Sequence, residues 1–104
     1  MTQRCKSIGK ARCSGIVYDV VTATPRKSGE MSSAVCGWQS YSSAMIYVSS
    51  RLPDAVSRST ILHECLHAVF PDWTEEQIDG AEARLFPFLS DPVNRDIINH
   101  IIGG

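Results

Sequence analysis

Hydrophobic and polar positions divide the chain into a first half with β character and a second half with helical periodicity. Residues 16–21 (IVYDVV) form a β-branched run that predicts a strand. Residues 35–41 and 44–49 are two further extended segments, and the Ser42-Ser43 pair between them indicates a hairpin. Residues 22–33 contain Pro and Gly among small polar residues, so we expect an exposed loop there.

The second half begins with a helix that carries apolar residues at helical spacing. Pro53 and Asp54 are favoured at a helix N-terminus, and Pro71 stops the pattern. The apolar positions between them are Val56, Ile61, Leu62, Cys65, Leu66, Val69 and Phe70.

Two more helices are expected after Pro71. Thr74 is a good N-cap for the second, with Gln77 at the spacing of a capping box, and Pro87 is expected to kink or end it. Asp91-Pro92 opens the third helix, and Gly103 is its C-terminal stop. The apolar positions are Ile78, Ala81, Leu85 and Leu89 in the second helix and Val93, Ile97, Ile98, Ile101 and Ile102 in the third.

These elements predict an α+β fold with a small two- or three-stranded sheet, antiparallel or mixed, packed on the first helix and closed by two further helices. Residues 16–104 are expected to form a single domain. Residues 1–15 are polar and lack periodicity, and they are expected to form a flexible N-terminal arm.

Composition excludes some classes of protein. The formal net charge is −1 with a pI near 6.3, whereas an electrostatic nucleic-acid binder shows a basic excess. No apolar run approaches the roughly 18 residues that span a bilayer, and the basic N-terminus has no apolar segment behind it. We therefore expect a cytoplasmic protein with no nucleic-acid or membrane partner.

The four cysteines do not form a C-x-x-C motif, and disulfides are rare in a reducing compartment. Cys5 and Cys13 lie in one basic segment, where they could pair or share a metal. Cys65 lies within an apolar helical run and is expected to be a small buried apolar side chain.

The sequence His63-Glu64-Cys65-Leu66-His67 is an HExxH motif inside the first predicted helix. Residues four apart on a helix lie on one face, so both imidazoles can reach one tetrahedral zinc ion. Glu64 lies beside the metal, where it can act as general base toward the zinc-bound water. A random order of this composition produces HExxH only about once in 250 chains, so the motif favours a zinc site.

A third protein ligand is needed, with the fourth position left to water. At 100° per residue, Glu75 and Glu82 lie nearer the apolar face of the second helix than Glu76 and Asp79 do. We predict Glu75 as the third ligand, with Glu82 and Glu76 as alternatives. His100, the only other histidine, is expected to be structural or exposed.

Residues 45–89, from MIYVSS through TILHECLHA to TEEQID, resemble the minimal gluzincin-type metallopeptidases, including small ones encoded by phages and bacteria. The resemblance covers fewer than half of the residues. It implies a zincin-like helix with His63 and His67 as ligands, Glu64 as general base and a glutamate of the second helix as third ligand. By the same resemblance, the strand at 44–49 could align an extended peptide, or could simply cover the helix.

The function expected from the sequence is therefore zinc-dependent hydrolysis of peptide bonds, with a peptide or protein as substrate. The alternative is a non-catalytic domain stabilised by zinc, such as a regulatory or phage accessory protein. An intact Glu64 favours catalysis, because a purely structural site has no use for a base there, and structural zinc sites are usually rich in cysteine.

Overall fold

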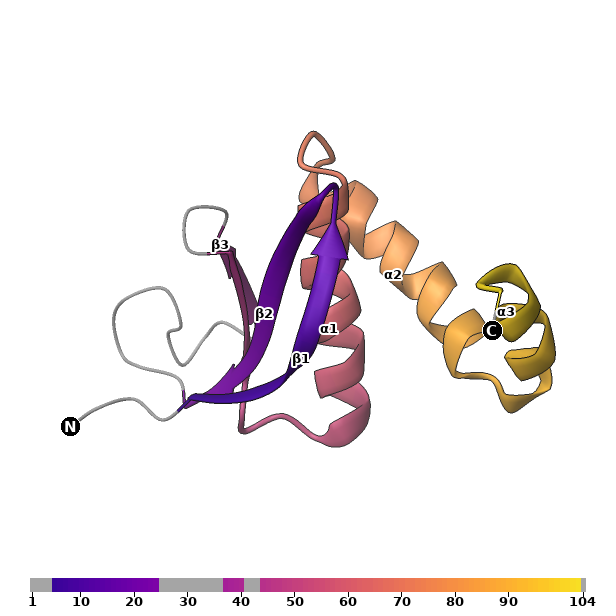
Figure 1. Cartoon of the computed structure of the whole chain (residues 1–104), viewed down its shortest axis with the longest axis horizontal. Coiled ribbons are helices and arrows are strands. Elements are labelled where there is room, and N and C mark those ends of the chain that lie inside the picture. Colours follow the sequence, from indigo (N-terminus) through magenta and orange to yellow (C-terminus); the bar gives the residue numbers. More distant parts are fainter. Residues whose placement is uncertain (1–4, 25–36, 41–43, 104) are drawn as a thin grey trace.

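The chain folds as a four-stranded mixed sheet with helices on one side (Figure 1). The computed structural model describes residues 5–24, 37–40 and 44–103. In the sheet order β1-β2-β4-β3, β2 is antiparallel to β1 and parallel to β4, and β3 is antiparallel to β4. The predicted α+β class is confirmed, with one strand more than expected. The strands are β1 (Cys5–Cys13), β2 (Ile16–Ala23), β3 (Gly37–Ser40) and β4 (Met45–Ser49).

The additional strand, β1, lies where we expected a flexible arm. Ser14 and Gly15 connect it to β2, and both have positive φ, as the two central residues of a type I′ hairpin turn require. Residues 6–10 of β1 are exposed, because the strand lies at the edge of the sheet. An exposed edge strand needs no alternation of apolar and polar residues, so hydrophobic periodicity did not reveal it.

The predicted hairpin is present as β3 and β4. Ile46 and Val48 of β4 are fully buried, whereas Met45 and Tyr47 on the opposite face are half-buried. The expected loop begins later than predicted, because residues 22 and 23 belong to β2, and most of it lies outside the described residues.

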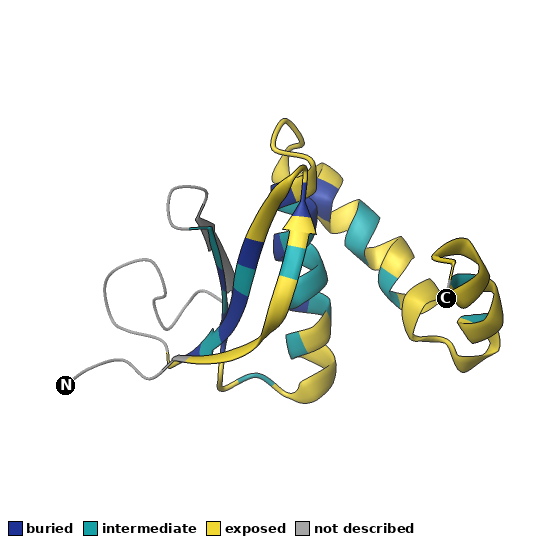
Figure 2. Cartoon of the chain, in the orientation of Figure 1, coloured by how far each residue is buried: buried dark blue, intermediate teal, exposed yellow. Residues whose placement is uncertain are grey.

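The core lies between the sheet and α1 (Asp54–Val69), whose bounds match the prediction. Tyr18 and Val20 of β2 meet Ile46 and Val48 of β4, and Ala68 of α1 packs on them. The dark ribbon in Figure 2 shows that burial is concentrated in this layer and at the contact of α1 with α2. One side of α1 therefore packs against the sheet, and its other side contacts α2 and carries the histidines of the HExxH motif.

α2 (Glu75–Ser90) begins with the predicted capping box. The Gln77 backbone N–H donates to Thr74 Oγ1 at 3.2 Å, and the Thr74 N–H donates to Gln77 Oε1 at 2.8 Å. Ile78, one turn further, is completely buried. Leu85 and Leu89 of the same predicted apolar face are exposed, so only the start of α2 is packed.

Pro87 does not end α2, which continues to Ser90. The proline lies in the last turn, where it removes only its own hydrogen bond, and its carbonyl still accepts from the Asp91 N–H at 3.1 Å. A 3₁₀ turn, η1 (Pro92–Asn94), leads into α3 (Arg95–Ile101), so the predicted third helix starts as a 3₁₀ turn. Gly103 follows it with positive φ. Among the described residues, no helix has the length and apolar character needed to cross a bilayer.

Cys5 and Cys13 do not pair within the chain, contrary to one possibility left open above. They lie at opposite ends of β1, about 25 Å apart along an extended strand, which is too far for a disulfide or a shared metal. Cys13 instead lies against Cys65 of α1 in the core, and burial raises the pKa of the Cys65 thiol to about 12. Cys65 thus behaves largely as the apolar side chain that was expected.

The capping box sets where α2 begins, and its loss should therefore lower stability. We expect Thr74→Ala to reduce the free energy of unfolding by about 1 kcal/mol, or about 4–8 °C in melting temperature. Thr74→Ser keeps the hydroxyl and should melt within about 2 °C of the wild type. Thermal denaturation followed by circular dichroism measures both, and an alanine variant as stable as the wild type would contradict this role.

Candidate metal centre

His63, Glu64 and His67 lie on α1, on the side turned away from β1. The two imidazole rings are 4.9 Å apart, edge to face, which is the arrangement expected for residues four apart on a helix. Glu64 is buried, with 8% of its surface exposed. Cys65, the next residue, contacts Cys13 at the end of β1, and Glu64 points about 100° away from it around the helix axis. Ile61 and Ala68, which face the core, lie between Cys65 and Glu64 around the helix axis, so Glu64 lies on the side of α1 that is away from β1 and toward β3, the opposite edge of the sheet.

The first turn of α2 brings Glu75 between the two histidines. Its Oε1 is 2.6 Å from His63 Nε2, and its Oε2 is 3.0 Å from His67 Nε2. A short link from Phe70 to Thr74 makes this approach possible, because it places the start of α2 beside the end of α1 (Figure 1). The structure thus brings together the three residues predicted as metal ligands.

The other ring nitrogen of His63 faces two further carboxylates of α2. Nδ1 is 2.8 Å from Glu82 Oε1 and 3.4 Å from Asp79 Oδ1. Glu82, an alternative third ligand in the sequence, therefore occupies a second position behind His63. Asp79, expected to lie farther from the apolar face of α2 than Glu75 and Glu82, still reaches His63, but at a longer distance than either of them.

Spacing could have identified this face. Glu75, Asp79 and Glu82 lie at i, i+4 and i+7, which is one side of a helix. Glu76 has no place in either group of potential metal ligands among the described residues.

The charges around His63 favour its protonated form in the metal-free protein. Burial by itself lowers the pKa of His63, but the hydrogen bond to Glu82 and the charges of three nearby glutamates outweigh it, and the pKa is raised above the usual 6.5. The geometry agrees with this direction. Both ring nitrogens face carboxylate oxygens, and only the imidazolium donates from both.

Glu64 is in the opposite situation, since its surroundings disfavour its charge. Burial raises the pKa of its carboxyl group, the two histidines lower it, and the charges of Glu75 and Glu82 raise it further, so that the pKa lies above its ordinary value. A buried carboxyl group with a raised pKa is suited to accept and return a proton near neutral pH.

The side chains present fit a zinc ion. One ligand atom from each of His63, His67 and Glu75 lies within 4.8 Å of the others, and two imidazoles with one carboxylate form a donor set used by catalytic zinc. Ligand atoms on tetrahedral zinc are about 3.3 Å apart, so the Glu75 oxygens must withdraw from the two histidines by up to about 0.7 Å. Glu75 can do so, since 64% of its side chain is exposed.

Electrostatics also favours a cation here. Four carboxylates, those of Glu64, Glu75, Asp79 and Glu82, surround two imidazoles, and a divalent ion would compensate much of this negative charge. His100 takes no part, because it is exposed on α3, as expected. The chain matches no model of a known protein family, no curated protein and no solved structure.

The raised pKa of His63 predicts that the metal-free protein loses stability as the pH rises. The folded-state pKa exceeds the unfolded-state value of about 6.5, so the contribution of this imidazolium is complete below about pH 6 and is lost as the pH rises through the folded-state pKa. In the presence of a chelator, we expect the melting temperature to fall as the pH rises above about 6.5, the unfolded-state pKa of histidine.

Glu82→Gln is the informative variant for this titration, because it removes the negative charge next to His63 Nδ1. The fall in melting temperature with rising pH should therefore be smaller in this variant than in the wild type. Glu76→Gln, on the same helix but outside the cluster, should show the same fall in melting temperature as the wild type. If the melting temperatures of Glu82→Gln and the wild type fall equally with pH, the Glu82 carboxylate does not stabilise the protonated form of His63.

Proposed function

We propose that this chain is a zinc-dependent peptidase in which His63, His67 and Glu75 hold the metal. The observation that carries the proposal is the convergence of Glu75, from α2, on the Nε2 atoms of both histidines of the HExxH motif. A chance HExxH on an amphipathic helix gives no reason for a carboxylate from another helix to bridge the two rings.

Glu64 is the general base of the proposed reaction. Zinc, when bound, lowers the pKa of a coordinated water to about 7 and polarises a carbonyl oxygen. Glu64 is next to the ligand His63 in sequence and is not in either potential ligand group, so its carboxylate remains available. It accepts the proton of the attacking water and transfers it to the leaving amine.

Glu82 and Asp79 hold His63 in position. A ligating histidine usually donates its other N–H to a carboxylate, which fixes the orientation and the tautomer of the ring. Here Nδ1–H donates to Glu82 at 2.8 Å, so Nε2 is the nitrogen left for the metal. Both carboxylates belong to the helix that supplies Glu75, and one element therefore provides both the third ligand and the support of the first.

A substrate peptide would pair with β3 and not with the strand at 44–49. β4 is paired with β2 on one side and with β3 on the other, so its backbone groups are already used. β3 is the edge strand opposite β1 among the described residues, and it contacts α1. An extended peptide added there would lie on the Glu64 side of the helix.

Metal content and turnover in matched variants test this proposal. We expect one zinc per chain in the wild type, in Glu64→Gln and in Glu76→Gln, and less than about a tenth as much in His63→Ala and Glu75→Gln. His100→Ala is the control for loss of a histidine. Elemental analysis after dialysis measures the metal.

Cleavage of a random-sequence peptide library, read by mass spectrometry, then separates catalysis from a structural role. We expect Glu64→Gln to keep its zinc and to lose at least about 100-fold in rate. A zinc-loaded wild type that cleaves no peptide, and a Glu64→Gln variant indistinguishable from it, would favour the non-catalytic zinc domain. Absence of zinc from the wild type would refute the metal site itself.

Glu82 is expected to affect metal affinity without being a ligand. Glu82→Gln should bind zinc about 10- to 100-fold more weakly than the wild type, because the imidazole it supports becomes a poorer and less well-oriented donor. Competition with a chromophoric chelator gives the affinity, and Glu76→Gln is again the matched control. Equal affinities for the two variants would remove Glu82 from this role.

A further inference from the structure

The C-terminal end of the chain exposes a row of large apolar side chains. Val93 of η1 is 87% exposed, and Ile97 and Ile101 of α3 are 57% and 69% exposed. They are four residues apart, so they form one stripe along the helical segment, and Ile102 beside them is 70% exposed. Figure 2 shows the end of α2 and nearly all of α3 in the colour of exposed residues. Contiguous apolar surface of this kind is typical of an interaction site.

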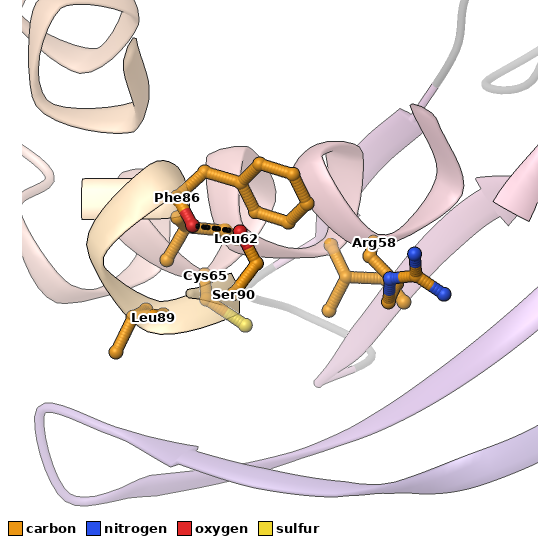
Figure 3. Close-up of a pocket in the computed structure, with 7 residues that line it drawn as sticks. Arg58, Leu62, Cys65, Phe86, Leu89 and Ser90 are labelled. Carbon is orange, nitrogen blue, oxygen red and sulfur yellow. Dashed lines mark hydrogen bonds between the residues drawn. The ribbon is translucent and has the colours of Figure 1, made fainter. Parts of the chain in front are cut away.

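The same chain contains an apolar groove of about 510 Å³ between α1 and the second half of α2. Its walls include Leu62 and Cys65 of α1 and Phe86 and Leu89 of α2. Figure 3 shows the Phe86 ring over the middle of the groove, with Arg58 at one end and Leu89 toward the other. Ser90 donates its hydroxyl to the Phe86 carbonyl at 2.7 Å, so this polar group is satisfied locally. The groove therefore favours an apolar occupant.

The charges at these two features are complementary. Arg58 forms no ion pair among the described residues, although it lies at the end of an apolar groove. Asp96, next to Ile97 on α3, forms none either. The groove thus presents a cation beside apolar walls. On α3, Asp96 lies next to the exposed Ile97, whereas the neighbouring Arg95 lines the separate depression between α3 and the end of α2.

Within one chain, the stripe does not meet the groove. Ile98 is the α3 side chain that turns back toward α2, where it lines a separate depression with Leu89 and Pro92. This leaves Ile97 and Ile101, on the neighbouring face of the helix, exposed. Leu89 borders both hollows, so the stripe and the groove lie at the same end of the molecule.

We propose that two copies of the chain associate so that the stripe of Val93, Ile97 and Ile101 of each copy fills the α1/α2 groove of the other. A helix that lays apolar residues four apart into a groove is a common mode of recognition. The exchange is reciprocal, as an interface with twofold symmetry requires, and it closes without leaving a free stripe or groove. Asp96 of each copy then faces Arg58 of its partner.

The histidine site lies on a different side of α1, since Arg58, Leu62 and Cys65 are turned away from His63 and His67 around the helix. The association is therefore independent of whether the chain is a peptidase. If the chain does not dimerise, the proposal of a metal site is unaffected. If the chain binds no metal, the proposal of a dimer is unaffected.

Sedimentation velocity on the full chain tests the proposal at concentrations between about 1 and about 100 µM, where an interface of modest size dissociates. We expect a monomer–dimer equilibrium in the wild type. Ile97→Glu should raise the dissociation constant at least tenfold, because it places a charge in the apolar contact. Ile16→Glu makes the same change at an exposed isoleucine on β2 and should leave the dissociation constant within about twofold of the wild type.

Charge exchange gives a second and independent test. Arg58→Glu and Asp96→Lys should each weaken the dimer, and the double variant Arg58→Glu/Asp96→Lys should recover most of the loss. Melting temperatures measured alongside show whether each variant is folded. A wild type that stays monomeric, an assembly larger than a dimer, a dimer unaffected by Ile97→Glu, or a double variant no better than the single ones would overturn the proposal.

Discussion

The contact between α1 and the first turns of α2 determines the position of every group in the candidate metal centre. Ile78 is fully buried in this contact. Glu75 lies three residues before it and Glu82 four residues after it, so both carboxylates flank the buried side chain on the same side of the helix. A shift of one residue would rotate α2 by about 100°, expose Ile78 and carry Glu75 away from the histidines. Burial of one apolar side chain therefore sets the register of the polar site.

The sheet supports the site from behind. Tyr18 and Val20 together with Ile46 and Val48 pack against one side of α1, and Glu64 is buried with 8% of its surface exposed. Like charges crowd the opposite side, where four carboxylates approach two imidazoles. Such an arrangement costs free energy unless protons or a cation compensate it, and the raised pKa of His63 reflects that cost, whereas burial is the main cause of the raised pKa of Glu64. A bound metal would replace the protons.

The parts of the fold that could be predicted are those with a local cause. Proline and capping residues fixed the ends of α1 and the start of α2, since they act on the backbone within a few residues. Pro87 was misleading because a proline in the last turn of a helix removes a single hydrogen bond and leaves the rest. β1 was missed for a related reason: an exposed edge strand has little apolar pattern, and only the Ser14-Gly15 turn marks it.

By itself, the sequence determined the α+β class, the HExxH helix and the candidate ligands His63 and His67, because spacing along a helix decides which side chains share a face. It favoured Glu75 as the third ligand but left Glu82 and Glu76 as alternatives. Tertiary structure alone decided that Asp79 and Glu82 stand behind His63, that β3 and not β4 is the edge strand opposite β1 among the described residues, and that the apolar residues of α3 are left exposed. These features depend on how elements distant in the chain pack against one another. Helical periodicity gives the apolar face of an element, but not the partner that covers it.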